Sequence, residues 1–490
     1  MKTRLTITRI LLAAVLCLVP LAVGAEEAKA PAAAAPAASV AAPDAAPAAA
    51  VPATAAAAPA EAPKPKNVDP VLNTGDTAWM LISSALVLVM LPGLALFYGG
   101  MVRQKNVLST MMHSLVAMGI VGVQWAVIGY SLAFGPDAYM GLIGNASKAM
   151  LNGLITFKDG NPVYTLFQNV ATEPGAVPEY VFAMFQGMFA IITVALISGA
   201  LAERIKFSAY CVFVLLWTTI VYDPLAHWVW MVDGWLFKKG ALDFAGGTVV
   251  HLASGISALA ALMFLAKRHG FPTERMAPHN LPLTLLGAGL LWFGWYGFNA
   301  GSAIAGVNTS DAAGGLAALA FTTTTIAPAA GGLAWMVAEW IHSGKPSALG
   351  FASGVVAGLV GITPAAGFVQ PGAALVIGLG AGVVCYLGIL MKAKFKYDDS
   401  LDAFGVHGVG GTFGALITGV LATVGATGLT SGNVKQLVTQ VIAVAAAGAY
   451  AFIVTIVIAF ILDKTIGLRV EKEDEIMGLD QTQHSETAYN

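Results

Sequence analysis

Long hydrophobic stretches separated by short polar ones recur along the chain from residue 76 onward. They cover approximately residues 76–99, 107–134, 179–201, 208–230, 244–266, 281–303, 312–341, 348–369, 372–392, 404–424 and 436–462. A helix that crosses a bilayer needs about 20 consecutive, mostly apolar residues. The pattern therefore predicts an all-α, polytopic membrane protein with eleven transmembrane helices. Glycine is frequent inside these stretches, as in helices that pack closely within a membrane.

The polar stretches carry an uneven distribution of basic residues, which predicts an orientation. If the chain enters from outside, the cytoplasmic loops and C-terminal tail hold fourteen basic residues: Arg103, Lys105, Arg204, Lys206, Lys267, Arg268, Arg275, Lys345, Lys392, Lys394, Lys396, Lys464, Arg469 and Lys472. The outer loops hold five: Lys148, Lys158, Lys238, Lys239 and Lys435. Because basic residues accumulate on the cytoplasmic side, we expect the N-terminus outside and the C-terminus inside.

The N-terminal region differs from the rest. It begins with a basic stretch and an apolar run at residues 10–23, followed by Val23-Gly24-Ala25, which is typical of a cleavable signal peptide at residues 1–25. An uncleaved first helix is the alternative. Residues 26–70 are mostly Ala and Pro, which predicts a disordered tether. We expect the membrane domain at residues 71–462 and a cytoplasmic tail at residues 463–490.

Composition supports a membrane protein and excludes several other classes. Hydrophobic residues make up 57% of the chain and charged residues 11%, whereas soluble domains carry about 25% charged residues. The net charge of −2 argues against a nucleic-acid partner. Three cysteines are too few for a disulfide scaffold.

The fifth and tenth stretches share a pattern that predicts an internal repeat. Each has an aspartate near its start, then a glycine-rich segment and a histidine: Asp243 with His251, and Asp402 with His407. Because the two stretches would run in opposite directions, the pattern predicts an inverted repeat of five plus five helices with an added C-terminal helix. Chance similarity between glycine-rich helices is the alternative.

Two histidines, His251 and His407, fall well inside hydrophobic stretches. Ionisable groups at membrane depth are costly and usually functional, and a neutral imidazole can both donate and accept a hydrogen bond. Two core histidines bonded to backbone carbonyls are the alternative. Zinc needs three or four nearby ligands, and neither histidine has a partner at metal-binding spacing. We therefore predict no metal and no cofactor.

Aromatic residues recur on single helix faces and could attract a small cation. Trp292, Trp295, Phe298 and Ser302 are spaced three or four residues apart, so they share one face. Core packing or an interfacial aromatic belt is the alternative. In a functional reading, the rings supply cation–π attraction and the hydroxyl of Ser302 accepts a hydrogen bond.

Several longer strings resemble the bacterial ammonium transporter family of the Amt type. These are GLALFYGGMVRQKNVLS, GALAERIKFSAY, ALDFAGGTVVH, PHNLPLTLLGAGLLWFGWYGFNAGS and DAFGVHGVGG. The resemblance extends in one order over roughly residues 71–490. It implies a transporter in the bacterial inner membrane, not an enzyme, that assembles as a homotrimer with one pore through each subunit.

The resemblance also implies roles for individual residues. It places an outer ammonium site at Trp230, Phe189 and Ser302, and a gate of two stacked rings at Phe189 and Phe298. The lumen below would be lined by Trp295, His251 and His407. Asp243 would act structurally or electrostatically near the outer site, and Asp402 would cap or stabilise its helix near the inner mouth.

The implied activity is ammonium transport. Ammonium would be recruited at the outer site, lose a proton near the gate and pass as ammonia along the two histidines, with a possible separate proton transfer. The tail resembles the segment that in relatives couples subunits and helps a PII-type signalling protein block the inner mouths. An ammonium sensor that signals to a cytoplasmic partner is the alternative, although only about 28 residues follow the last helix, too few for a further domain.

Overall fold

The structure is a computed structural model that describes residues 69–168, 175–305 and 313–489. The predicted signal peptide and nearly all of the predicted Ala/Pro tether lie outside these residues. Their boundaries, and the division between membrane domain and tail, therefore stay predictions.

Within the described residues, nine helical stretches are long and apolar enough to cross a membrane. In chain order they are α2 (Thr74–Met101); η2 (Gln104–Asn106) continuing into α3 (Val107–Gln124), η3 (Trp125–Gly129) and α4 (Tyr130–Phe134); α5 (Glu179–Leu201); α6 (Phe207–Trp217) continuing into η5 (Thr218–Tyr222), α7 (Asp223–Trp230) and the short α8 (Trp235–Lys238); α10 (Leu281–Ala305); α11 (Ala313–Ser343); α13 (Pro371–Phe395); η7 (Phe404–Gly408) continuing into α14 (Val409–Leu421); and α15 (Val434–Thr465).

Two shorter apolar helices complete the set of eleven predicted spans. They are η6 (Gly247–Leu252) continuing into α9 (Ala253–Leu262), and α12 (Ala348–Ile362). Both are shorter than predicted. The first begins only after Gly246, whose φ of 112° is not helical, and the second ends where Thr363 and Pro364 follow. The prediction of an all-α polytopic fold is confirmed.

Among the residues that the structure describes, four segments, η3, η5, η6 and η7, are π-helical. Hydrophobic periodicity did not predict them. Such turns are rare and often lie at functional sites. Each of the two helices that carry the predicted histidines begins with one, which supports the predicted relation between the fifth and tenth spans.

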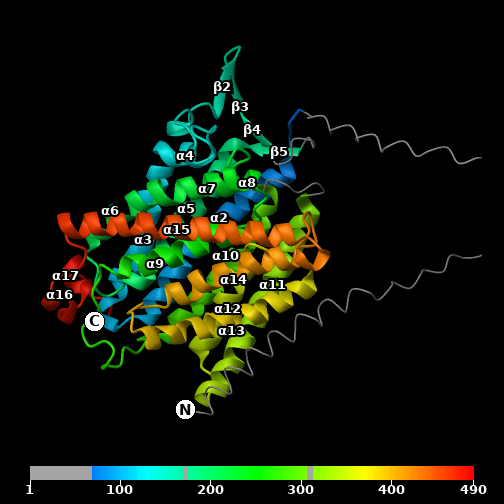
Figure 1. The fold of residues 1–490 in the computed structure, drawn as a ribbon. Coiled ribbons are helices and arrows are strands. Elements are labelled where there is room, and N and C mark those ends of the chain that lie inside the picture. The colour runs from blue at the N-terminus through cyan, green and yellow to red at the C-terminus, as the bar shows by residue number, and fades with distance from the viewer. Residues whose placement is uncertain (1–68, 169–174, 306–312, 490) are drawn as a thin grey trace, which may run out of the picture.

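In the described part of the chain, five short strands lie between α4 and α5 or just before α2, and they were not predicted. β1 (Val71–Leu72) pairs in parallel with β5 (Gly175–Pro178), which pairs antiparallel with β4 (Leu166–Gln168). β2 (Ile155–Lys158) and β3 (Asn161–Tyr164) form a hairpin that projects from the helical bundle (Figure 1). We name this end of the bundle, where α5 begins, the hairpin side.

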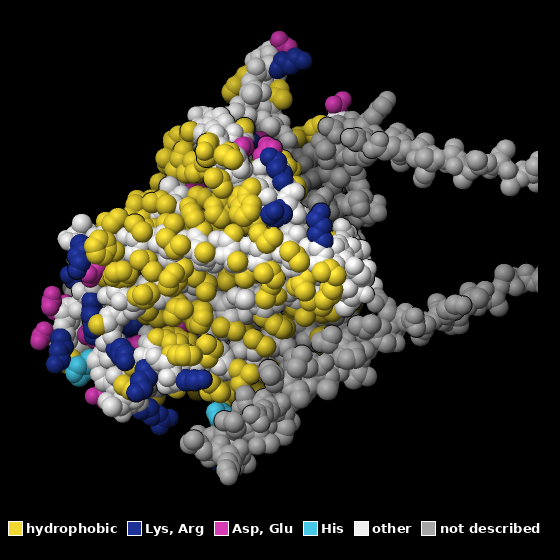
Figure 2. All heavy atoms as spheres, viewed as in Figure 1, with side chains coloured by type: hydrophobic (Ala, Val, Ile, Leu, Met, Phe, Trp, Pro, Cys, Tyr) yellow, Lys and Arg dark blue, Asp and Glu magenta, His cyan; other side chains and the backbone are white. Residues whose placement is uncertain are grey.

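Helix α5 forms the centre of the bundle and α15 lies at its surface. In the most apolar window of α5, 89% of residues are buried, against 28% for α15. Figure 2 shows hydrophobic side chains over most of the face that α15 crosses, while charged side chains gather near α16 and α17. An apolar exterior with charged ends is what a bilayer requires of a spanning bundle.

The C-terminal tail packs against the opposite end of the bundle, which we name the tail side (Figure 1). Its helices are α16 (Lys472–Met477) and α17 (Leu479–His484). Two 3-10 turns lie elsewhere: η4 (Ala149–Leu151) on the hairpin side, and η8 (Leu429–Ser431) just before α15. The backbone amide of Leu479 donates to Asn106 Oδ1 at 2.9 Å. In the other direction, the backbone amide of Ser109 donates to Asp480 Oδ1 at 2.8 Å. These bonds fix α17 to the start of α3.

Candidate functional site

The two predicted histidines meet in the interior of the bundle. His251 lies on η6 and His407 on η7, and their Nδ1 atoms are 3.2 Å apart. The ring centroids are 5.3 Å apart and the planes are inclined by 16°. Both side chains are buried. Residues 156 positions apart therefore share a hydrogen bond, in which one Nδ1 donates and the other accepts.

Glycines let the two histidine-bearing helices approach this closely. A Cβ on Gly255 would lie 2.0 Å from the backbone nitrogen of Gly408, and one on Gly411 would lie 2.9 Å from Cβ of His251. Any larger residue at Gly255 would force the helices apart. The backbone crossing therefore depends on glycine at this position.

A row of aromatic rings continues from the histidines toward the hairpin side. Phe298 lies 6.1 Å from His251 and stacks on Phe189 at 4.0 Å with planes inclined by 22°. Phe189 meets Trp230 edge to face, at 5.9 Å and 90°. Phe189 and Phe298 are fully buried, whereas Trp230 is partly exposed. The two stacked rings thus separate Trp230 from the histidines.

Ser302 lies one helical turn after Phe298 on α10. Its hydroxyl donates to the carbonyl of Phe298 at 2.8 Å, which leaves its oxygen lone pairs available as acceptors.

An apolar cavity lies directly against the histidine pair. Its lining consists of Met90, Leu94, Phe97, Ile192, Leu196, His251, Leu291, Trp295, Phe298, Val356 and His407. Trp295 stacks on His251 at 5.3 Å and 18°, and its indole N–H donates to Thr363 Oγ1 at 2.8 Å. With that N–H engaged, the imidazoles are the polar groups of the lining that remain for a solute.

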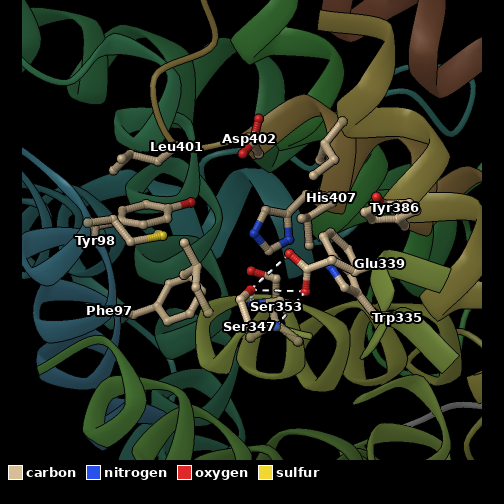
Figure 3. Close-up of a pocket in the computed structure, with 16 residues that line it drawn as sticks. Phe97, Tyr98, Trp335, Glu339, Ser347, Ser353, Tyr386, Leu401, Asp402 and His407 are labelled. Carbon is tan, nitrogen blue, oxygen red and sulfur yellow. Dashed lines mark hydrogen bonds between the residues drawn. The ribbon is translucent and has the colours of Figure 1, made fainter. Parts of the chain in front are cut away.

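His407 also lines a second, more polar pocket, which Figure 3 shows in close-up. Its wall includes two carboxylates, Glu339 and Asp402, and the side chains of Tyr98 and Tyr386. Both oxygens of Glu339 accept a hydrogen bond from Ser347 Oγ at 2.9 Å. His407 therefore stands between an apolar and a polar compartment.

Asp243 closes the hairpin-side end of the first histidine helix. Its two carboxylate oxygens accept hydrogen bonds of 2.6–3.0 Å from the amides of residues 246–249. Its backbone carbonyl accepts from Trp230 Nε1 at 2.9 Å. One residue thereby positions both the start of η6 and the indole of Trp230.

The corresponding acid in the second half is Asp399, and not Asp402 as the sequence comparison suggested. Asp399 accepts from the amides of Ala403 and Phe404 at 3.1 and 2.8 Å, whereas the carboxylate of Asp402 pairs with Lys392 at 2.5 Å. Burial, and then the negative charge of Asp402, raise the pKa of Asp399 to about 6. The equal spacing could have identified it, because Asp243 and Asp399 each precede their histidine by eight residues.

Among the described residues, no group of three or more histidine, cysteine or acidic side chains is arranged to hold a metal ion.

Comparison with known proteins identifies the family. Residues 78–489 match the Ammonium Transporter Family. The chain belongs to this family. This ammonium transporter is 48% identical to the ammonium transporter of Mycobacterium tuberculosis strain H37Rv, over 85% of this chain and 90% of that protein. It is 47% identical to that of Bacillus subtilis strain 168, over 85% of this chain and 99% of the relative.

Solved structures of relatives share the transporter's fold. The crystal structure of Saccharomyces cerevisiae Mep2 superposes with a TM-score of 0.73 and 35% identity, covering 82% of this chain and 89% of Mep2. The structure of a sensor Amt protein gives a TM-score of 0.73 at 29% identity, covering 84% of this chain and 98% of the sensor. The protein is therefore an ammonium transporter by family and a multi-pass membrane protein.

The structure brings together most of the residues singled out in the transporter sequence. Trp230, Phe189, Phe298, Trp295, His251 and His407 form one connected series, with Ser302 one turn from Phe298 and Asp243 bonded to Trp230. Asp402 lies apart from the series, at the polar pocket. Sequence reasoning missed Asp399, Thr363 and Gly255.

Proposed function

We propose that the protein recruits ammonium beside Trp230, Phe189 and Ser302, removes a proton near the stacked rings of Phe189 and Phe298, and conducts ammonia past the two histidines. The observation that carries this proposal is the apolar cavity whose available polar groups are the imidazoles of His251 and His407. No metal or cofactor is needed for it.

Selectivity follows from the polarity of that cavity. Ammonium and potassium have the same charge and similar size, so charge cannot separate them. Burying an unpaired ion in an apolar medium costs many kcal/mol, on the order of tens by ideal Born solvation. Ammonium can lose its charge by releasing a proton, and potassium cannot. A path that requires deprotonation therefore rejects potassium.

The histidine pair suits ammonia because of its shared hydrogen bond. The ring that donates through Nδ1 presents an unprotonated Nε2, and the ring that accepts presents an Nε2–H. One ring can then accept a hydrogen bond from ammonia while the other donates to its lone pair. Nε2 of His251 has no partner within the described residues, so it is available for such a contact.

The proton released from ammonium follows a separate route that involves the imidazoles. Net charge then crosses the membrane although the lumen passes a neutral molecule. This step makes the transporter electrogenic.

A current measurement on a solid-supported membrane tests the proposal. Liposomes that contain only this protein should give a transient current on addition of ammonium and none on addition of potassium. The double variant His251→Ala, His407→Ala should lose selective flux. Full-rate, potassium-excluding transport by that variant would refute the role of the histidines.

We propose a bacterial inner-membrane location with the hairpin side outside and the tail side in the cytoplasm. The excess of basic residues on the tail side supports this orientation. Protease protection of the tail in right-side-out vesicles tests it. Cleavage of α16 or α17 from outside would reverse the assignment.

We also propose a homotrimer, with the tail as the docking site for a PII-type signalling protein. Rings on α10 and α11, such as the half-buried Tyr296 stacked on the exposed Phe321, offer an apolar surface to lipid or to a neighbouring subunit. Native mass spectrometry of the purified protein tests the trimer, and co-purification with a PII-type protein tests the partner.

The sensor reading remains the alternative because a sensor Amt protein shares the fold. It predicts ammonium binding without an ammonium-driven current, so the same electrical measurement separates the two.

A further inference from the structure

A second ionisable group lies at membrane depth, outside the ammonium path. Asp223 is near the middle of the span Phe207–Lys238 and its side chain is fully buried. It does not line the cavity beside the histidines. None of the ion pairs in the described part of the chain includes it.

One oxygen of Asp223 is held and the other is free. Gln124 Nε2 donates to Asp223 Oδ2 at 2.7 Å and also to Thr219 Oγ1 at 3.1 Å. Asp223 Oδ1 and Gln124 Oε1 are buried and have no partner among the described residues. A buried carboxyl with an unused oxygen is unusual, because buried polar groups are nearly always bonded.

The backbone around this pair is irregular on both helices. The π-helical segment η3 begins directly after Gln124, and η5 ends directly before Asp223. Thr218 and Tyr222, the first and last residues of η5, also have buried hydroxyls without a partner in the described chain. Two π-turns and four unpaired polar atoms therefore lie in one small region of the membrane interior.

Electrostatics determines what such a carboxyl can bind. An isolated ionised carboxylate in an apolar interior is so costly that the group takes up a proton instead. Intramembrane carboxyls without a basic partner commonly serve as proton relays. The proton can bind to the unpaired Oδ1 of Asp223, while the hydrogen bond from the Gln124 amide to Oδ2 holds the carboxyl in place.

A connection leads from this region to the hairpin-side end of the ammonium path. Helix α7, which begins at Asp223 and ends at Trp230, packs against η6, whose first amides are bonded to Asp243. Asp243 in turn binds the indole of Trp230 through its carbonyl. Asp223 is also only two helical turns from Trp230 along α7.

We propose that Asp223, held by Gln124, is a proton-binding site that carries the charge left when ammonium is deprotonated. The site rests protonated, gives its proton to the imidazole route that leads toward the tail side and is left as a carboxylate. Beside Trp230 an N–H bond of ammonium then breaks, the electron pair stays on nitrogen to give ammonia, and the released proton is transferred to the carboxylate, where it forms an O–H bond. The inference rests on the proposed deprotonation.

Infrared difference spectroscopy tests the site without any transport. Titrating the purified full-length protein should produce a carbonyl band of a protonated carboxyl that disappears in Asp223→Asn. Asp233→Asn is the matched control, because Asp233 is half exposed and pairs with Lys238 at the surface. Gln124→Leu should shift the band, because it removes the donor to the carboxyl but leaves the carboxyl itself.

The role in charge movement is tested by comparing current with ammonia uptake in the same liposomes. Asp223→Asn should reduce the ammonium-evoked current by at least about tenfold while ammonia still enters and the thermal unfolding midpoint is unchanged. Asp223→Glu should restore part of the current. Asp233→Asn should behave as the wild type.

The outcomes separate the two proposals. A carboxyl band that survives both Asp223→Asn and Gln124→Leu overturns the proton site. A current in Asp223→Asn equal to that of Asp233→Asn overturns its role in charge movement. A wild-type protein that passes no ammonium-evoked current refutes the proposed transport mechanism itself, and the infrared result then still decides whether Asp223 binds a proton.

Discussion

Asp243 illustrates how one side chain organises a helix end that has no ordinary cap. The first amides of a helix lack partners within the helix and carry partial positive charge. Asp243 meets four of them with two oxygens. Bonds to an ionised acceptor are roughly twice as strong as neutral ones. The carboxylate therefore holds η6, and with it His251, in position.

We predict that Asp243→Ala destabilises the protein by about 3 kcal/mol or more, because four buried amides lose their acceptor. Asp243→Asn should have a smaller effect, since one oxygen remains. Thermal unfolding in detergent measures the loss, and Asp233→Ala is the control because that residue is half exposed. Equal destabilisation by Asp243→Ala and Asp233→Ala would show that the hydrogen bonds to the Asp243 carboxylate do not stabilise the fold.

Between elements, the decisive contact is the crossing of the two histidine helices at Gly255 and Gly408. We predict that Gly255→Ala separates them, because its Cβ would lie 2.0 Å from a backbone nitrogen that cannot move alone. The effect should exceed the roughly 1–3 kcal/mol of ordinary overpacking and should also abolish ammonium-evoked current. Thermal unfolding and the current assay measure both effects.

Gly119→Ala is the matched control for this crossing. Gly119 lies within α3, and no atom of the described residues lies within 4 Å of the Cβ that alanine would add. The control should be neutral or stabilising by about 0.5–1 kcal/mol, since alanine restricts the unfolded chain. If both glycine variants behave alike, the close approach does not limit the fold.

On the tail side, Glu203 joins loops from three parts of the chain. It accepts hydrogen bonds from Arg103 at 2.8–3.1 Å, from Asn106 at 3.1 Å and from Arg268 at 2.9 Å. Burial alone would raise the pKa of Glu203, but the charges of Arg268 and Arg103 outweigh it and hold the pKa below its usual 4.5. The paired carboxylate thus stabilises the fold above about pH 4.5 and loses that contribution as the pH falls through the lowered value.

We predict that Glu203→Gln destabilises the protein by about 3–5 kcal/mol, because it leaves buried arginine charge without its partner. The unfolding midpoint of the variant should also fall less with decreasing pH than that of the wild type. Thermal unfolding from about pH 7 down to about pH 3 measures both effects. Glu274→Gln is a suitable comparison, because Glu274 is exposed and takes part in none of the ion pairs of the described chain. If the unfolding midpoint of Glu203→Gln changes with pH as steeply as that of the wild type, Glu203 does not link stability to pH.

The elements that the sequence could predict are those set by local hydrophobicity. The length of apolar stretches sufficed for the spans, and α5 (Glu179–Leu201) begins and ends at the predicted residues. The π-turns and the strands of the hairpin side were not predictable in this way. They depend on which distant backbone groups bond to each other, and hydrophobic periodicity carries no information about that.

The same limit applied to the candidate site. The aromatic and histidine residues were identifiable because their types and strings resemble a family. Asp399 was missed because Asp402 lies nearer to His407 in the sequence, and only the bonded amides of Ala403 and Phe404 distinguish the two. Asp223 had no resemblance to point to it, and its burial without a basic partner became visible only in the folded chain.

Over the whole molecule, the tail is linked to the loops that border the pocket on the tail side. Lys105 Nζ donates to carbonyls of Glu475 and Ile476 at 3.0 and 2.5 Å, and the amide of His269 donates to Glu475 Oε1 at 2.6 Å. Neighbouring Arg103 and Arg268 line the pocket on the tail side. A tail that leaves its place therefore releases contacts at the mouth of the proposed path.

Docking of the tail should depend on pH through His484. Its ring packs against Phe207 at 4.8 Å. Burial lowers the pKa of His484 below its usual 6.5, although Asp480 and Glu486 act in the opposite direction. The imidazole of His484 therefore binds fewer protons in the docked tail than in a free tail, so its contribution to docking is strongest above about pH 6.5 and weakens as the pH falls through the lowered value. Hydrogen exchange of residues 472–484, corrected for intrinsic rates, should be faster at about pH 5.5 than at about pH 7.5. His484→Gln should remove most of this difference, and a tail equally protected at both pH values in the wild type would show that His484 does not control docking.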